Sequence, residues 1–379
     1  MDLDYTSVVT RVVEEKCSAE DAVSIFVNIL ENKITISDGV VVGNYIWAID
    51  YYSNLLLCIN TANRSAEIAD AFYKTWNYKE EGFKKIIIYE DFLYLIPGKE
   101  KYVVEFDTKN RKSEIYQLDK YSDYMSAFVY ENYLYMIARG DGLSYKINLI
   151  KHQIEIDPVV NGTGFLGGTL VDDYYICGLY PDNRLVRYDL KGGKIEIIEI
   201  GETDTYYVDC SYDGEKIYCL TQNGEIHAFN KGLDYHTKIA VNDYIVEKKK
   251  WFYQGMSVLE DYILLIPNRK AEWKIVYKKD YRIETINSFN DLYPQGETIF
   301  PCRSVIDGTQ NIYIPVIDGT YPIYTVNKCE VTFAKGWDVH YKGIDKQCIK
   351  EALNKMINYV GIMNRDDLNL LIKIMKYKK

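Results

Sequence analysis

The chain has 379 residues and a formal net charge of −10, with hydrophobic residues at 47% and charged residues at 26%. This length accommodates two or three ordinary domains or one large repeat domain, and the composition is normal for a soluble globular protein. The negative charge argues against a broad nucleic-acid interface, because such an interface needs a basic surface to neutralise phosphates. The 37 tyrosines favour a β-rich fold, since tyrosine suits a half-buried pleated surface.

Targeting and redox signals are weak. The first residues contain no basic region followed by an apolar run, so we expect no secretory signal. No stretch approaches 18 consecutive apolar residues, so we expect no transmembrane segment. The eight cysteines are scattered without a CxxC pair, which favours reduced, mostly buried thiols over a disulfide framework. These features predict a cytoplasmic protein, with secretion by an unconventional route as the alternative.

Residues 1–33 precede the repetitive part of the chain, and residues 18–32 are predicted to form a helix. Ser18 is a suitable N-cap, with Asp21 three residues later. The apolar residues that follow recur on one helical face: Ala22, Ile25, Phe26, Ile29 and Leu30.

Residues 34–338 repeat a short motif. The stretch "YEDFLYLIPG" at 89–98 returns as "YENYLYMIARG" at 130, "VDDYYICGLYP" at 171 and "LEDYILLIPN" at 259. Aligned on the motif aromatic, the positions are spaced by 47, 41, 41, 42, 46 and 50 residues: Tyr45, Phe92, Tyr133, Tyr174, Lys216, Tyr262 and Ile312. A period of this size with several short strands per unit is typical of β-propellers. One unit divides into the four strands "FKKIIIYE", "FLYLIPG", "KYVVEFD" and "SEIYQL".

Three further columns keep the same register. Asp or Asn follows the motif aromatic by 14 or 15 residues and is predicted to close the turn after the third strand: Asn60, Asp107, Asn148, Asp189, Asn230 and Asn327. Nine residues before the motif aromatic, another aromatic residue enters the first strand of five consecutive units: Phe83, Tyr124, Phe165, Tyr207 and Tyr253. Two residues later comes a small or polar column, which we expect to face a central channel: Lys85, Ser126, Gly167, Asp209 and Gly255.

The repeating unit resembles the seven-bladed β-propeller superfamily over residues 34–338. The resemblance is to the architecture, since the WD40 pattern is limited to Trp337-Asp338 and the kelch double glycine to Gly167-Gly168 and Gly192-Gly193. It implies an all-β fold, a seven-bladed β-propeller of four-stranded antiparallel blades, with short N-terminal and C-terminal helical segments. No functional residue carries over from either family, and the sequence does not show how the ring closes.

Residues 339–379 are predicted to form basic amphipathic helices. An apolar stripe runs through 345–359, a second short helix starts at Asn364, and residues 343–379 hold eight Lys or Arg against four Asp or Glu. Three interpretations remain open. The helices are a cap packed on the propeller, a docking element for a partner or a second copy, or a membrane-surface element.

Motifs for metal, nucleotide or catalytic chemistry have weak support. None of the four histidines has metal-binding spacing, so we expect no metal and no cofactor. The segment "GTGFLG" at 162–167 matches the dinucleotide fingerprint but joins two strands, whereas that motif requires a helix after it. Paired acids such as Glu90-Asp91 and Asp172-Asp173 recur at one repeat position, so we assign them to turns.

The loops that enter each first strand are the candidate binding surface, because Tyr and Trp combine apolar area with a polar group. The candidate ligand contacts are Trp76, Tyr124, Phe165, Tyr207, Trp251, Phe252 and Tyr253. For the aromatic column, the alternative interpretation is packing between blades. We expect a non-enzymatic recognition or scaffold protein that binds a peptide, protein or glycan. The alternative is a propeller enzyme, a lyase or hydrolase, that draws on polar residues of the channel: Lys85, Asp209, Gln254, Arg303 and His227.

Overall fold

The computed structural model describes 23 stretches of the chain. They are residues 18–32, 36–50, 54–60, 62–63, 65–72, 82–98, 101–120, 122–139, 142–158, 160, 164–180, 182–200, 206–234, 236–241, 252–267, 272–286, 305–306, 311–313, 321–325, 330–334, 338–341, 346–348 and 350–351. The described strands form one five-stranded sheet and six four-stranded sheets. They belong to two compact units, one made of Met1–Ile115 with Val305–Lys379 and the other of Tyr116–Ser304.

The first unit contains three sheets and the helix α2 (Ala19–Asn32). Its five-stranded sheet comprises β1 (Ile36–Val42), β2 (Tyr45–Asp50), β3 (Leu55–Asn60), β4 (Ser65–Ala71) and β29 (Asp338–Tyr341). A second sheet comprises β5 (Phe83–Tyr89), β6 (Phe92–Pro97), β7 (Tyr102–Asp107) and β8 (Lys112–Gln117), and the unit boundary falls within β8. The third comprises β25 (Val305–Ile306), β26 (Asn311–Tyr313), β27 (Tyr321–Thr325) and β28 (Glu330–Ala334).

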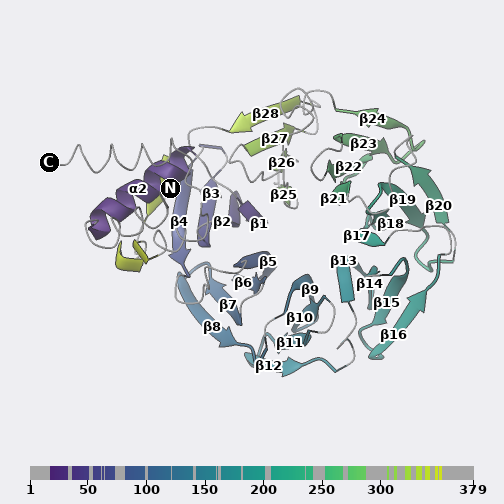
Figure 1. Ribbon diagram of the computed structural model, residues 1–379, viewed down its shortest axis with the longest axis horizontal. Coiled ribbons are helices and arrows are strands. Elements are labelled where there is room, and N and C mark those ends of the chain that lie inside the picture. The colour runs from purple at the N-terminus through teal and green to yellow at the C-terminus, as the bar shows by residue number, and fades with distance from the viewer. Residues whose placement is uncertain are drawn as a thin grey trace, which may run out of the picture. The chain divides into compact units, whose positions relative to one another are not determined.

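The second unit contains four sheets. The first comprises β9 (Tyr124–Tyr130), β10 (Tyr133–Ala138), β11 (Tyr145–Asn148) and β12 (Gln153–Ile156), and the second β13 (Gly164–Val171), β14 (Tyr174–Tyr180), β15 (Leu185–Asp189) and β16 (Lys194–Ile198). The third comprises β17 (Tyr207–Tyr212), β18 (Ile217–Thr221), β19 (Glu225–Phe229) and β20 (His236–Ala240). The fourth comprises β21 (Tyr253–Val258), β22 (Tyr262–Pro267), β23 (Lys274–Tyr277) and β24 (Ile283–Thr285). The first strands β9, β13, β17 and β21 contact one another in chain order (Figure 1). Apolar side chains fill the space between facing sheets, so the core of this unit is a series of layers between sheets.

The repeated motif is the hairpin between the first and second strands of a sheet. Tyr89 pairs with Phe92 across a two-residue turn, and Glu90 in that turn has a φ of 52°. Glu131 and Asp172 occupy the same place with φ values of 49° and 52°. The acidic residue at this position therefore shapes a left-handed turn, in agreement with the assignment of the paired acids to turns.

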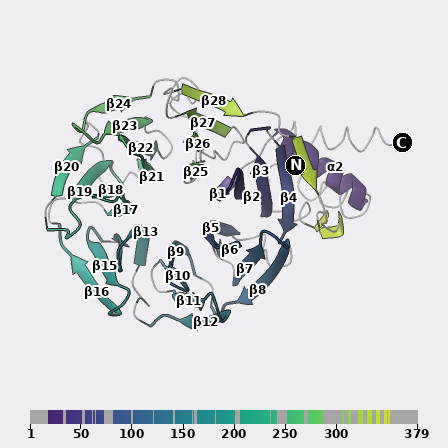
Figure 2. The same ribbon diagram turned by 180° about the vertical axis from the view of Figure 1, so that it is seen from behind.

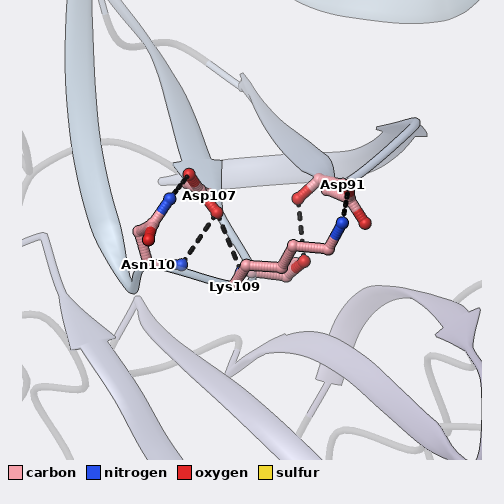
Figure 3. A network of polar contacts seen from close by, with 5 residues as sticks. Asp91, Asp107, Lys109 and Asn110 are labelled. Atoms are coloured by element: carbon pink, nitrogen blue, oxygen red, sulfur yellow. Dashed lines mark hydrogen bonds and ion pairs between the residues drawn. The ribbon is translucent and has the colours of Figure 1, made fainter.

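The Asp and Asn column closes the turn after the third strand, as predicted. Asp107 accepts hydrogen bonds from the backbone N–H groups of Lys109 and Asn110, at 2.8 and 2.9 Å (Figure 3). The ammonium group of Lys109 returns to Asp91 at 2.5 Å and so connects this turn to the first hairpin. Asn60, Asn148, Asp189 and Asn230 make equivalent backbone contacts, and Asn327 lies outside the described residues.

A β-bulge recurs in the first strand of six sheets, and in β5, β9, β17 and β21 it lies between the aromatic column and the small or polar column. It is present in β1, β5, β9, β13, β17 and β21. A bulge inserts one extra residue and bends the strand. The side chain that follows the bulge is thereby available to the neighbouring sheet.

Buried polar side chains after the bulge bond to the next sheet. The carboxylate of Asp38 on β1 accepts from the backbone N–H of Ile86 on β5, at 3.0 Å. The hydroxyl of Ser126 on β9 donates to the backbone oxygen of Leu166 on β13, at 2.8 Å, and Asp209 on β17 accepts from the N–H of Met256 on β21, at 3.1 Å. We call these three contacts the sheet-to-sheet bonds. The structure directs the Ser126 and Asp209 side chains to the neighbouring first strand, and the expectation that they face a channel stays a prediction.

The outer strands β4 and β8 of the first unit are also connected. The carboxylate of Glu67 accepts hydrogen bonds from both terminal nitrogens of the Arg111 guanidinium, at 3.1 and 3.0 Å. The same guanidinium lies 5.2 Å from the centre of the Trp47 ring. The hydroxyl of Ser113 donates to Asp70. These contacts join the two sheets at the side away from the bond between Asp38 and Ile86.

The C-terminal strand β29 adds to the first sheet. It pairs parallel with β4, with Asp338 opposite Ser65 and Tyr341 opposite Ile68. Helix α2 contacts β29 and lies beyond β4 (Figures 1 and 2). At its start, Ser18 and Asp21 exchange hydrogen bonds, with the Asp21 N–H donating to the Ser18 hydroxyl at 3.1 Å. Of the predicted C-terminal helices, residues 346–348 and 350–351 are helical and the rest lie outside the described residues.

The substitution Asp209→Ala tests the sheet-to-sheet bonds. It leaves the buried Met256 N–H without its acceptor, so we expect a loss of about 1–3 kcal/mol in the free energy of unfolding. The variant Asp209→Asn retains a side-chain oxygen and should lose less. Urea denaturation measures both, with the exposed Asp234→Ala as the control. If Asp209→Ala is as stable as the control, the bond does not hold the sheets together.

The substitution Asp70→Asn tests the outer contact through its pH dependence. Burial raises the pKa of the Asp70 carboxyl, while the Ser113 hydroxyl and the Ala71 N–H partly oppose the rise. Because the pKa of Asp70 is higher in the folded than in the unfolded state, ionisation of this carboxyl lowers the free energy of unfolding of the protein as the pH rises toward the folded-state pKa. Relative to the parent, Asp70→Asn should therefore gain stability between roughly pH 4 and pH 7. Urea denaturation at both pH values checks this, with the exposed Asp280→Asn as control. A constant difference across that range would contradict it.

Candidate recognition surface

The aromatic column lies in the core. Tyr124, Phe165, Tyr207 and Tyr253 are each 0% exposed, and Phe83 is 3% exposed. A ligand on the protein surface cannot touch side chains buried to this degree. The burial therefore favours the packing interpretation for these four candidate residues over ligand contact.

The remaining candidates have different surroundings. Phe252 is half-buried directly before β21, and Lys85 is half-buried in β5. Gln254 lies in β21, and its side chain lies outside the described part of the structure. Trp76, Trp251 and Arg303 lie outside the described residues, as do most of the loops that carry them.

A contiguous polar and aromatic cluster lies at the edge where the first strands begin. The guanidinium of Arg139, after β10, lies 4.7 Å from the ring centre of Tyr180, at the end of β14. The Tyr180 ring meets the Tyr206 ring edge-on, with centres 5.5 Å apart. The carboxylate of Asp123, before β9, forms an ion pair with the Arg139 guanidinium at 3.7 Å. The backbone oxygen of Asp123 also accepts a hydrogen bond from the backbone N–H of Arg139 at 2.8 Å. Three sheets thus contribute to one cluster.

The cluster extends to the fourth sheet through the backbone. The N–H of Gln222 donates to the oxygen of Tyr206 at 3.1 Å, and the N–H of Phe252 donates to the oxygen of Gln222 at 2.8 Å. Tyr206 and Phe252 also pack against the same buried cluster between β17–β20 and β21–β24. We refer to Arg139, Tyr180, Tyr206 and Phe252 as the entry surface.

The electrostatics of the entry surface favour hydrogen-bond donation by neutral tyrosine. Burial raises the pKa of Tyr206, the Tyr180 hydroxyl adds to the rise, and the positive charge of Arg139 opposes it. Tyr206 is therefore a neutral phenol at physiological pH, able to donate and to accept. The Asp123 carboxylate compensates the positive charge of Arg139. The entry surface therefore offers a ligand planar groups and hydrogen-bond donors and little net positive charge.

All four residues of the entry surface are half-buried, which leaves part of each side chain accessible. Rings and a guanidinium plane provide stacking faces, while the phenol and guanidinium edges provide hydrogen bonds. Such a surface can hold a ligand that presents an apolar or aromatic group beside a hydrogen-bond acceptor.

The sequence contains a further repeat signal at this surface. Arg139, Tyr180 and Gln222 each lie six residues after the motif position of their unit. Tyr206 lies in the loop "TDTYY", one residue before the buried Tyr207. Successive side chains of an extended segment point to opposite sides, so the half-buried Tyr206 directly precedes the buried Tyr207.

Two of the residues considered for catalysis, His227 and Asp209, are buried. His227 is 0% exposed on β19, where its ring stacks on His236 at 5.2 Å and meets Tyr207 edge-on at 5.5 Å. Asp209 is 7% exposed and makes the bond to Met256. Within the described stretches, no group of three or more His, Cys, Asp or Glu is arranged to hold a metal ion. Nor does any helix in those stretches have the length and apolarity to cross a membrane.

Comparison with known proteins places the chain by its fold. No protein-family model matches the sequence, and no curated protein matches it significantly. Similar solved structures include a catalytically inactive variant of virginiamycin B lyase from Staphylococcus aureus, with a TM-score of 0.57 and 13% identity over 76% of this chain and 94% of that one. YCF48 from Cyanidioschyzon merolae has a TM-score of 0.58 and 10% identity over 76% and 94%. PorZ from Porphyromonas gingivalis, a surface component of the type-IX secretion system, has a TM-score of 0.55 and 10% identity over 80% and 38%.

These neighbours are propeller proteins, so the predicted β-propeller architecture is confirmed. The fold is all-β, with sheets of four antiparallel strands as its repeating unit. At these identities the likeness concerns the fold alone, because propellers support many unrelated activities.

Adjacent tyrosines test the division between core and entry surface. Tyr207→Ala removes a fully buried ring and should cost about 3–5 kcal/mol in the free energy of unfolding. Tyr206→Ala removes a half-buried ring at the edge and should cost less than half as much. Urea denaturation of the two variants measures the difference. Equal costs would contradict the assignment of Tyr206 to a surface.

Proposed function

We propose that this chain is a non-enzymatic recognition protein that binds a peptide segment of a partner protein at the entry surface. The observation that carries the proposal is the contact series from Arg139 through Tyr180 to Tyr206, in which three sheets hold planar side chains together at one edge. Scaffold-held loops and strand ends are where repeat folds commonly place recognition.

The residue types favour a protein ligand. Tyr and Arg are enriched among the residues that dominate protein–protein binding, because they combine large contact area with directed hydrogen bonds. Tyr180 and Tyr206 support each other by their edge-on contact, and the Asp123 carboxylate holds Arg139. Side chains fixed before binding lose little conformational entropy when a ligand arrives.

A catalytic role is the second candidate. One structural neighbour is a lyase, which keeps a propeller enzyme under consideration. The burial of His227 and the backbone bond of Asp209 favour recognition, since neither side chain is available to a substrate at the surface.

We also propose that the seven sheets are the blades of one seven-bladed propeller, as the repeat predicts. The number of sheets supports this proposal, as does the occurrence of sheet-to-sheet bonds in each of the two units. Association with a partner or a second copy through the C-terminal helices of residues 339–379, and a cytoplasmic location, stay predictions.

Binding to peptide and glycan arrays tests the proposed function. The parent should bind a set of peptides, and Arg139→Ala and Tyr206→Ala should each weaken the best of them by at least about tenfold, as expected for residues that dominate an interface. The strand β14 offers matched controls at its other end, where the Arg187 guanidinium lies 5.3 Å from the Tyr174 ring. Tyr174→Ala and Arg187→Ala should bind like the parent.

The controls decide between outcomes. Equal loss in both sets of variants, or no loss at the entry surface, would reject that surface as the binding site. Selective loss of a glycan instead of a peptide would keep the surface and replace the ligand class. Circular dichroism of each variant confirms that the fold is retained.

A further inference from the structure

Two buried cysteines face each other across adjacent strands of the second unit. Cys210 on β17 and Cys219 on β18 are directly opposite in the antiparallel register. Their sulfur atoms are 3.2 Å apart, and the residues are 3% and 0% exposed. Opposite positions on antiparallel strands bring Cα atoms to about 4.5–5.5 Å, which lies within the range that a disulfide can span.

The fold does not require cysteine at these positions. The same register position holds Ile86 with Leu95 in one sheet, Ala127 with Met136 in another and Met256 with Leu265 in a third. In the sheet that precedes β17–β20, it holds Gly168 with Cys177. Aliphatic pairs therefore satisfy the packing elsewhere, and only β17–β18 among the described sheets places two thiols opposite each other.

We propose that Cys210 and Cys219 form an oxidative modification site, at which a small neutral oxidant of the azodicarboxamide class converts the two thiols into a disulfide. One thiol adds to the N=N bond of the oxidant, and the second sulfur displaces the resulting hydrazine. Two S–H bonds are lost and one S–S bond forms. The oxidant gains two hydrogens and becomes the hydrazine.

The surroundings define how this site reacts. Apolar neighbours Val171, Ile176 and Ile217 enclose the pair, so a charged reagent has no stabilising partner there. Burial raises the pKa of the Cys210 thiol, and the nearby Cys219 and Cys177 sulfurs add to the rise. Because the thiolate is the reactive form, oxidation is slow at neutral pH and accelerates as the pH rises. The disulfide joins β17 to β18, and β17 starts directly after Tyr206.

Peptide mapping after oxidation tests the site. The folded protein is treated with diamide, the remaining thiols are alkylated under denaturing conditions, and the digest is analysed by mass spectrometry. We expect a linked peptide pair that contains Cys210 and Cys219 and is lighter by two hydrogens than the two reduced peptides together. Cys177→Ser should retain this product.

Variants establish which sulfurs react. Cys210→Ala, which reproduces the residue of the equivalent position Ala127, should abolish the linked pair while circular dichroism shows a retained fold. Complete alkylation of both cysteines after diamide treatment would overturn the proposal. A product that links Cys177 to either cysteine in place of the expected pair would overturn it as well.

Discussion

The structure depends on how one four-stranded sheet attaches to the next. A single small sheet cannot bury both of its faces, so each sheet must present one face to a neighbour. The apolar layers between sheets provide the general attraction, and the sheet-to-sheet bonds fix the relative position of adjacent first strands. A buried carboxylate such as Asp209 is stable here because a backbone N–H of the next strand pairs with it.

The recurrent bulge makes this attachment possible and also separates core from surface. Upstream of the bulge, the aromatic ring of Tyr207 enters the layer between sheets. One residue earlier, Tyr206 lies at the edge and meets Tyr180 of the preceding sheet. The strand β17 thus supplies a packing residue and, through Asp209, a bond to the following sheet, and the residue directly before it belongs to the entry surface. Residues of the entry surface and residues of the core are therefore direct neighbours in the sequence, as are Tyr206 and Tyr207.

The sequence predicted the repeated elements well because their causes are local. The hairpin motif and the Asp or Asn turns depend on backbone conformations and hydrogen bonds within a few residues, as at Glu90 and Asp107. Strand positions followed from the period of the motif. The paired use of Ser18 and Asp21 at the start of α2 has the same local character.

Features that depend on distant parts of the chain were not predictable in this way. The parallel pairing of β29 with β4 joins residues more than 270 positions apart, and no local pattern encodes it. The contact between Arg139 and Tyr180 spans two sheets, and each residue alone resembles an ordinary strand end. The bond from Asp209 to the Met256 N–H was not predicted either, because the residue pattern does not reveal the bulge before Asp209 or the neighbouring strand that it reaches.

Hydrogen–deuterium exchange with and without the best-binding peptide tests the central claim, that the entry surface is where a ligand binds. The account predicts slower exchange in the segments around Arg139, Tyr180, Tyr206 and Phe252, with unchanged exchange around Tyr174 and Arg187 at the opposite end of β14 and β15. Protection confined to the Tyr174 end, or to the first unit, would contradict it.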